Sequence, residues 1–303
     1  MSKALKIQSL TKTYANDFHA LKGINLSVAE GDFFALLGSN GAGKTTMIGI
    51  ICGLLEKTAG NISVLGLEQS KNVAKVKSLI GLMPQEFNFN PFEPIEEILI
   101  NQAGYHGIER NQARKNAKAL LKRVELWDKR HDMAKSLSGG MKRRLMLARA
   151  LVHKPKILIL DEPSAGVDVE IRRSMWQFLK ELNKDGMTII LTTHYLEEAE
   201  SLCRNIAIVN DGKIVEQTSM RQLLAQVSQQ VLILESAKKL INIPAELEFS
   251  ITQLDEYSLE ASVESGIGIT QVLQTLAQND IEITHVRSAQ NRLETLFLNL
   301  VNK

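Results

Sequence analysis

The fold is decided by the stretch Gly38-Ser39-Asn40-Gly41-Ala42-Gly43-Lys44-Thr45-Thr46. The apolar run at residues 33–37 precedes it and predicts a short buried strand. Apolar residues between 47 and 55 follow it and predict a helix that starts at Lys44. A glycine, four residues and Gly-Lys-Thr between a strand and a helix form the pattern of a phosphate-binding loop. An ordinary glycine-rich turn, the alternative, does not account for the full pattern in this setting.

The residue types of this loop suit an anion. Glycines let the backbone curl so that several N–H groups point into one concavity, and the helix start adds the positive end of its dipole. Lys44 is placed to reach the β- and γ-phosphates of a nucleotide, and the Thr45 hydroxyl to ligate Mg²⁺. We therefore expect residues 38–46 to bind nucleotide.

Composition limits the remaining possibilities. The chain has 303 residues, of which 44% are hydrophobic, enough for one large domain or two with a sizeable core. Net charge is only +2 and no block of like charge stands out, so nothing favours a nucleic-acid partner. No apolar run approaches the ~20 residues of a membrane helix, so any spans would belong to another chain. Cys52 and Cys203 lie far apart in apolar surroundings and are expected to be reduced, space-filling thiols.

The pattern of strands and helices predicts an α/β fold. Residues 5–10 and 24–28 alternate between apolar and polar types, as in two strands of a half-buried antiparallel sheet. The other expected strands cover residues 33–37, 61–65, 79–83, 157–160, 188–191 and 206–209, and a turn at Asp211-Gly212 closes a hairpin with 214–215. Helices at 169–183 and up to 202 separate the later strands, which predicts a parallel, doubly wound sheet.

Two further regions differ from this core. Residues 95–152 carry apolar side chains at helical spacing, which predicts a helical insertion of about residues 90–152. Beyond about residue 225 the candidate functional residues stop, and the remainder predicts a small α+β domain. Its expected elements are strands at 231–234, 247–251, 259–263 and 281–283, and helices at 269–276 and 293–300. We expect two domains, 1–224 and 225–303.

Acidic residues end the strand at 157–160. A carboxylate there, Asp161, can hold Mg²⁺, and a second beside it, Glu162, can polarise an attacking water. An acidic pair at a helix start before Pro163 is the structural alternative. His194 follows the strand at 188–191, and ligands of such sheets bind beyond the carboxyl ends of the strands. The phosphate loop, the acidic pair and His194 are therefore expected at one edge.

A second glycine motif stands at Leu137-Ser138-Gly139-Gly140, before a strongly helical run. Ser138 is a candidate N-cap, and the glycines leave backbone N–H groups open to an anion. On physical grounds alone, a plain capping turn explains this motif better than a second anion site.

The order of these motifs resembles the ATP-binding subunit of an ABC transporter, over about residues 4–218. The resemblance implies a P-loop NTPase with a RecA-like core, an antiparallel β subdomain and a helical insertion. It also implies that Tyr14 stacks on adenine and that Gln85, which follows a strand, senses the γ-phosphate and Mg²⁺. The phosphate loop matches the family's over Gly38, Ser39, Asn40, Gly41, Ala42, Gly43, Lys44, Thr45 and Thr46.

The same resemblance assigns the remaining motifs. Asp161 matches the family's Mg²⁺-holding aspartate, Glu162 its general base, and His194 a histidine that contacts the γ-phosphate. Ser138, Gly139 and Gly140 match its signature motif, and residues 164–168 its loop across the dimer interface. Two positions depart from the usual pattern: Met141, where glutamine is frequent, and Gly166-Val167, where leucine alone is frequent.

In this family two ATP molecules lie between two such domains arranged head to tail. The resemblance therefore implies a homodimer with ATP and Mg²⁺, a separate polytopic transmembrane permease and no nucleic-acid partner. It places the protein peripherally on the cytoplasmic face of the inner or plasma membrane. ABC-2-type exporters, the group with the multidrug and daunorubicin-resistance transporters, are the most similar subfamily, on residues 84–92, 137–144, 192–200 and 292–297.

Other functions stay open at this point. The chain could serve an importer, or be a soluble ATPase of the superfamily acting on ribosomes or DNA. Such soluble members usually carry two motif sets or a long coiled-coil insertion, whereas this chain has one set and no sustained heptads. Phe87, Phe89 and Phe92 either form a groove for a helix of the membrane partner or pack the helical insertion, and the C-terminal region is either a ligand-binding module or a dimer brace.

Overall fold

A computed structural model describes residues 2–226, 229–240, 244, 247–264, 268–289 and 292–301. The chain divides into two compact units, Met1–Thr218 and Ser219–Lys303. The division lies six residues before the boundary expected after Leu224, because α8 (Met220–Leu224) packs against α10 (Arg292–Val301) of the second unit. In the part of the chain that is described, no helix combines the length and apolar character needed to cross a bilayer.

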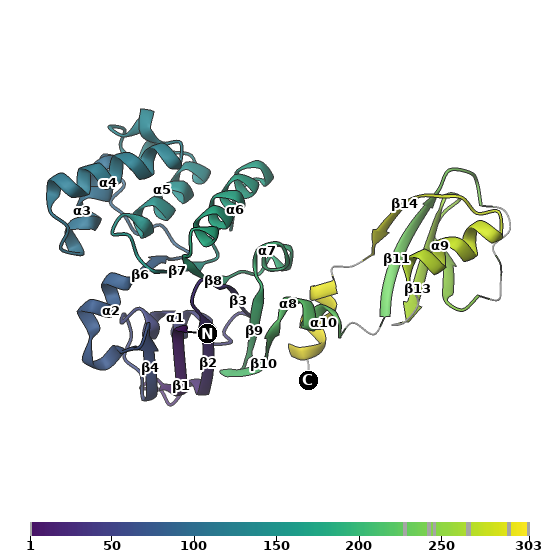
Figure 1. Cartoon of the computed structure of the whole chain (residues 1–303), viewed down its shortest axis with the longest axis horizontal. Helices are drawn as coiled ribbons and strands as arrows, with labels where there is room; N and C mark the ends of the chain where they lie inside the picture. Colours follow the sequence, from purple (N-terminus) through teal and green to yellow (C-terminus); the bar gives the residue numbers. More distant parts are fainter. Residues whose placement is uncertain are drawn as a thin grey trace. The chain divides into compact units, whose positions relative to one another are not determined.

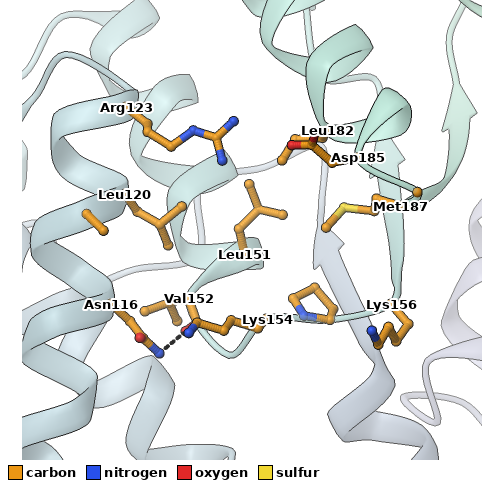
Figure 2. Close-up of a pocket in the computed structure, with 13 residues that line it drawn as sticks. Asn116, Leu120, Arg123, Leu151, Val152, Lys154, Lys156, Leu182, Asp185 and Met187 are labelled. Atoms are coloured by element: carbon orange, nitrogen blue, oxygen red, sulfur yellow. Dashed lines mark hydrogen bonds between the residues drawn. The ribbon is translucent and has the colours of Figure 1, made fainter.

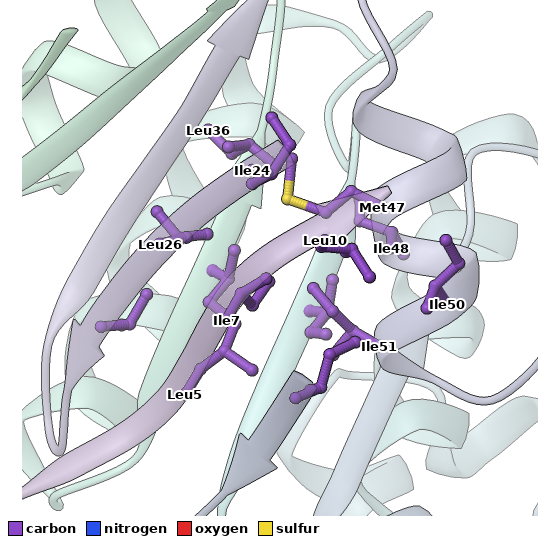
Figure 3. Close-up of a cluster of buried hydrophobic side chains, with 14 of the residues drawn as sticks. Leu5, Ile7, Leu10, Ile24, Leu26, Leu36, Met47, Ile48, Ile50 and Ile51 are labelled. Atoms are coloured by element: carbon purple, nitrogen blue, oxygen red, sulfur yellow. The ribbon is translucent and has the colours of Figure 1, made fainter. Parts of the chain in front are cut away.

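An antiparallel sheet forms one layer of the first unit, as predicted. Its strands are β1 (Lys3–Thr13), β2 (His19–Ala29), β4 (Ala59–Val64) and β5 (Leu67–Glu68), in the order β2-β1-β4-β5. Leu5 pairs with Val28 and Ile7 with Leu26, so the alternating apolar side chains share one face. Figure 3 shows that face packed against Leu36 of the main sheet and the apolar side of α1 (Lys44–Ile51).

The main sheet has the order β10-β9-β3-β8-β7-β6. Its strands are β3 (Phe33–Gly38), β6 (Ile80–Met83), β7 (Ile157–Asp161), β8 (Thr188–Thr192), β9 (Asn205–Asn210) and β10 (Lys213–Ser219). The five strands from β9 to β6 run parallel, which confirms the predicted parallel sheet. Every residue of β7 and β8 is buried, as expected of strands covered on both faces.

Helices occupy the span between β6 and β7 (Figure 1). α3 (Ile95–Tyr105), α4 (Arg110–Arg123) and α5 (Gly139–Leu151) share an apolar core that includes Leu99, Ala117 and Leu145. This confirms the helical character expected for residues 95–152. α2 (Val73–Leu79), α6 (Val169–Lys184) and α7 (Leu196–Leu202) complete the α-helices of the first unit.

The helix after the phosphate loop is shorter than expected. The apolar pattern predicted helix to Leu55, but α1 ends at Ile51 and Leu54 is 65% exposed. Gly53 takes a left-handed conformation (φ 67°), and the N–H groups of Leu54 and Leu55 both donate to the Gly49 carbonyl. A glycine in this conformation ends a helix, so the prediction was wrong at its C-terminal turn.

The second unit is built on a four-stranded antiparallel sheet with the order β12-β13-β11-β14. The strands are β11 (Gln229–Ser236), β12 (Ser250–Gln253), β13 (Ser258–Glu264) and β14 (Ile283–Ser288). Val272 and Leu276 of α9 (Ile269–Gln278) pack with Leu234 and Leu259. The strand expected at 247–251 begins only at Ser250, and the strand expected at 281–283 begins only at Ile283. Residues 245 and 246, just before the first of these, lie outside the described residues.

Two stacked histidines join the helical span to the sheet. The rings of His106, at the end of α3, and His153, after α5, lie 3.7 Å apart with a 2° angle between their planes. His153 Nε2 donates to the Ile80 carbonyl oxygen over 3.0 Å. Burial and the neighbouring His106 lower the pKa of His153 to about 4. The folded protein therefore takes up this proton less readily than the unfolded chain.

Acidification should destabilise the protein through His153. The unfolded chain binds this proton below its ordinary pKa of 6.5 and the folded protein only near pH 4, so stability falls as pH drops through that window. Between pH 7 and pH 5 we expect this group to lower the free energy of unfolding by roughly 1 kcal/mol, allowing for its partial exposure. Urea unfolding at both pH values should show a smaller difference for His153→Phe than for the wild type. The exposed His131→Gln serves as control, and equal pH differences in all three proteins would contradict the assignment.

Candidate active site

A pocket of about 820 Å³ opens at the carboxyl ends of the parallel strands. It gathers residues from the β1–β2 connection and the start of β2, from the loop after β3 and the start of α1, and from the ends of β6, β7 and β8. Its lining residues are Tyr14, Phe18, Ala20, Asn40, Gly41, Gly43, Lys44, Thr45, Thr46, Gln85, Asp161, Glu162 and His194. The structure thus brings together the phosphate loop, the acidic pair and His194 at one edge, where the sequence placed them.

The phosphate loop depends on glycine at two points. Gly41 (φ 80°) and Gly43 (φ 105°) are left-handed, a conformation that side chains with a Cβ disfavour. A Cβ on Gly43 would also lie 2.7 Å from the Ala20 carbonyl oxygen, and one on Gly38 only 2.4 Å from that of Val209. The loop is therefore packed directly on the backbone of β2 and β9, which fixes its curvature.

Lys44 is buried within this curve. Its ammonium donates to the carbonyl oxygens of Gly38 (2.7 Å) and Ser39 (3.0 Å). Burial lowers the pKa of Lys44, and the negative charges of Glu162 and Asp161 act in the opposite direction. The site therefore holds one cation opposite two acidic side chains, an arrangement suited to phosphate and a divalent cation together.

Glu162 has an unusual backbone. Its φ of 50° is uncommon for a residue with a side chain, and its N–H donates to the Thr192 carbonyl over 3.0 Å. Its carboxylate oxygen Oε2 accepts from Gln85 Nε2 (3.3 Å) and His194 Nδ1 (2.9 Å). The buried Asp161 carboxylate accepts a hydrogen bond from the Thr192 hydroxyl. Three predicted site residues, Gln85, His194 and Glu162, are thus joined through the Oε2 atom of Glu162.

Oxygen donors suited to Mg²⁺ line the same pocket. The Thr45 hydroxyl, the Gln85 side-chain carbonyl and the Asp161 carboxylate all belong to its wall. Magnesium prefers hard oxygen ligands and takes the rest of its octahedron from water and substrate phosphates. The residues present therefore fit a cation bound together with a nucleotide phosphate.

An aromatic pair forms part of the pocket wall. Tyr14 and Phe18 stack with ring centres 6.4 Å apart, and the Tyr14 hydroxyl lies 3.2 Å from Thr46 Oγ1. The sequence interpretation selected Tyr14 but missed the exposed Phe18. A second aromatic residue in the short connection between two predicted strands was the available signal. Such a pair offers flat apolar surface to a ring of a ligand.

The signature residues lie elsewhere. Ser138 caps α5 by accepting the Met141 N–H over 3.3 Å, and neither it nor its glycines line the pocket. Ser138 and Gly139 are exposed, and no atom would crowd a Cβ on Gly139. Gly140 is buried, and a Cβ on it would lie 2.3 Å from Ile171 Cδ1. The structure does not bring this motif to the phosphate loop of the same chain.

Sequence reasoning also missed Glu198, on α7 just after His194. Its side chain is fully buried and accepts a hydrogen bond from Trp176 Nε1 over 2.8 Å. Burial raises its pKa, against the influence of neighbouring polar groups. Its position one turn before the buried Leu202, on the inward face of the helix, was the signal that could have revealed it.

A second pocket, of about 550 Å³, lies between α4, the end of α5 and the turn after α6 (Figure 2). Leu120, Leu151 and Met187 form apolar walls, with Arg123 and Lys154 beside them, and Asn116 donates to the Val152 carbonyl. None of the predicted site residues lines this pocket. Of these two pockets, the first is therefore the one that holds predicted site residues.

The sequence matches one family model and aligns with known proteins over most of its length. The family model described as "ABC transporter" matches residues 21–165. The linearmycin resistance ATP-binding protein of Bacillus subtilis is 32% identical, with 99% of this chain and 98% of that protein aligned. The Nod factor export ATP-binding protein I of Burkholderia thailandensis is 38% identical over 73% of this chain and 72% of its own length.

Solved structures agree with these sequence matches. A dimeric ATP-binding cassette in a post-hydrolysis state with ADP and Pi superposes with a TM-score of 0.66. It is 30% identical, and the match covers 72% of this chain and 99% of that one. A part of an ABC transporter complex from Clostridium perfringens gives a TM-score of 0.67 at 29% identity, over 75% of this chain and 92% of its own.

Proposed function

Because the chain belongs to the ATP-binding subunits of ABC transporters, we propose that it is the ATP-hydrolysing motor of a membrane exporter. The observation that carries this proposal is the single pocket that joins the phosphate loop to Asp161, Glu162, Gln85 and His194. Relatives named for Nod factor export and linearmycin resistance support the direction of transport.

The pocket residues then have definite roles in hydrolysis. Lys44 and the loop N–H groups bind the β- and γ-phosphates, while Tyr14, with Phe18 beside it, stacks on adenine. Thr45, Gln85 and Asp161 would hold Mg²⁺, which supplies positive charge to the phosphate oxygens. The nucleotide-binding loop in this proposal comprises Gly38, Ser39, Asn40, Gly41, Ala42, Gly43, Lys44, Thr45 and Thr46.

Glu162 is the proposed general base. A water oxygen attacks the γ-phosphorus in line as the bond to the β-phosphate oxygen breaks, and Glu162 accepts the proton of that water. His194 orients the Glu162 carboxylate through its 2.9 Å contact and presents its ring to the γ-phosphate. Catalysis consists mainly of positioning and charge stabilisation.

The two parts of the chain have separate proposed roles. Residues 1–224 form the ATP-binding domain, with a helical subdomain at about 90–152 that holds α3, α4 and α5. Residues 225–303 form a small accessory domain. The compact division of the structure near this boundary supports the assignment.

A head-to-tail homodimer completes the site in this proposal. Ser138, Gly139 and Gly140 of one subunit would close over the γ-phosphate bound to the loop of the other. The exposure of Ser138 and Gly139 outside the pocket of their own chain supports this, as does the dimer in a similar cassette. ATP binding would close the dimer and hydrolysis release it.

The proposed membrane partner is a separate polytopic permease, with this subunit peripheral on the cytoplasmic face of the inner or plasma membrane. Phe87 and Phe92, after Gln85, are 44% and 67% exposed. Phe89, by contrast, packs against the apolar core of α3, α4 and α5. We assign the permease contact to Phe87 and Phe92, and the packing role to Phe89.

Replacing the proposed base should separate binding from hydrolysis. Glu162→Gln keeps the shape of the side chain but cannot accept the proton, so we expect ATP turnover to fall by at least about 100-fold. The variant should still bind ATP and accumulate as a closed dimer, measured by light scattering after size exclusion with ATP. Glu170→Gln, an exposed residue of α6, is the control. Full turnover by Glu162→Gln would show that the base is assigned wrongly.

Mixing two inactive variants tests the shared site. Lys44→Ala and Ser138→Arg should each be inactive alone. In a head-to-tail dimer of one subunit of each, one site combines an unaltered loop with an unaltered Ser138. Random mixing should therefore restore roughly a quarter of wild-type ATP hydrolysis. If mixed dimers form but hydrolyse ATP no faster than the separate variants, each site lies within a single chain.

Charge on the exposed aromatic surface should block assembly. Phe92→Glu places a carboxylate on a side chain that is 67% exposed, so the fold should survive while an apolar contact with the permease is lost. Co-purification of the permease with the tagged subunit measures the effect, and we expect a loss of tenfold or so. Leu54→Glu, at 65% exposure in the segment after α1, is the matched control. Undiminished recovery with Phe92→Glu would refute the contact.

A further inference from the structure

Arg143 occupies a position where an apolar residue is expected. It follows the signature motif on α5, in the buried stripe that also holds Gly140, Leu147 and Ala150. Its neighbours Lys142 and Arg144 are more exposed, whereas Arg143 is only 8% exposed. Charged side chains are rarely buried unless they are paired, so its partners explain its place.

Those partners are backbone groups of two other motif segments. Arg143 Nη1 donates to the Gln85 carbonyl oxygen over 2.6 Å, and Nη2 donates to that of Ala165 over 3.3 Å. The guanidinium carbon also lies 4.9 Å from the centre of the Phe87 ring. One side chain of α5 therefore holds the segment after β6 and the loop after β7 at a fixed separation.

These contacts close a ring around Glu162. Gln85 Nε2 donates to Glu162 Oε2, and the Ala165 N–H donates to the Glu162 carbonyl oxygen, each over 3.3 Å. Burial lowers the pKa of Arg143, and the negative charge of Glu162 opposes that effect. The guanidinium thus contacts both neighbours of the proposed base while Glu162 supplies the compensating charge.

We propose that Arg143 is a positioning residue for ATP hydrolysis, which sets Gln85 and Ala165 around Glu162. The inference rests on the proposed function, since it acts through the roles given there to Gln85 and Glu162. A rigid, planar fork can bond two carbonyls at once, whereas a lysine ammonium cannot keep the same two-point geometry. Because Arg143 lies outside the pocket lining, its loss should leave nucleotide binding by the loop and Tyr14 intact.

Arg143→Lys in the full-length protein tests this. Misplacing Gln85 and Glu162 should lower kcat for ATP about tenfold or more, with KM for ATP within about twofold of wild type. The Mg²⁺ concentration for half-maximal hydrolysis should rise several-fold, because Gln85 is a proposed Mg²⁺ ligand. A role in stability alone would lower the unfolding midpoint without this shift.

Arg144→Lys is the matched control. Arg144 is the next residue of α5 and bonds Glu125 and Ser174, away from the pocket. We expect this variant to keep wild-type kcat and Mg²⁺ dependence. Equal losses of kcat in the two variants, or an unaltered Mg²⁺ profile in Arg143→Lys, would overturn the inference.

Gln85→Ala separates this inference from the proposed function. If Gln85 works as proposed, its removal raises the Mg²⁺ concentration needed for half-maximal hydrolysis. Adding Arg143→Lys to this variant should raise that concentration no further, because Arg143 acts on Mg²⁺ binding through Gln85. A further full shift in the double variant would overturn the positioning role alone. A wild-type Mg²⁺ profile for Gln85→Ala would overturn the role of Gln85 in the proposed function, and this inference with it.

Discussion

The buried charge of Lys44 is the constraint on which the rest of the site depends. Removing an ammonium from water is unfavourable unless carbonyls and negative charge replace its hydration. The carbonyls of Gly38 and Ser39 do so within the loop, and Asp161 and Glu162 do so across the pocket. Because these acids end β7 while the loop follows β3, the balance exists only when β8 pairs between the two strands. The charge of Lys44 is therefore balanced only in a sheet that has this strand order.

The strands and the phosphate loop could be predicted from the sequence because their signals are local. Alternation identified β1 and β2, and a glycine pattern between a strand and a helix identified the phosphate loop. Side chains at the strand ends could be placed from the predicted sheet, but helix side chains that bond distant segments could not. Arg143 stands in the run Lys142-Arg143-Arg144, which has the composition of a solvated face, and only the folded chain shows that its partners are Gln85 and Ala165. α1 was overextended for a related reason, since apolar spacing continues past the conformation at Gly53 that ends the helix.

The two glycines of the signature motif are constrained differently, and the difference bears on assembly. At Gly140 a side chain would meet Ile171 of α6, whose Cδ1 would have to move aside. A Cβ on Gly139 would have open space around it, so no other part of the described chain crowds that position. A ligand or a second subunit that approached this backbone closely would meet no side chain at residue 139. The motif therefore combines an intramolecular packing constraint with a surface suited to an intermolecular one.

The ring around Glu162 gives the subunit a physical route between its surface and its chemistry. Phe87, on the surface assigned to the permease, lies against the guanidinium of Arg143, which bonds the carbonyl of Gln85. Gln85 in turn bonds Glu162, whose left-handed backbone conformation persists only where the surrounding structure holds it. A shift of the Phe87 segment would thus be passed on as a change in the position of the proposed base. In a motor driven by hydrolysis the same contacts act in reverse, because a coupling between two sites is reciprocal in free energy.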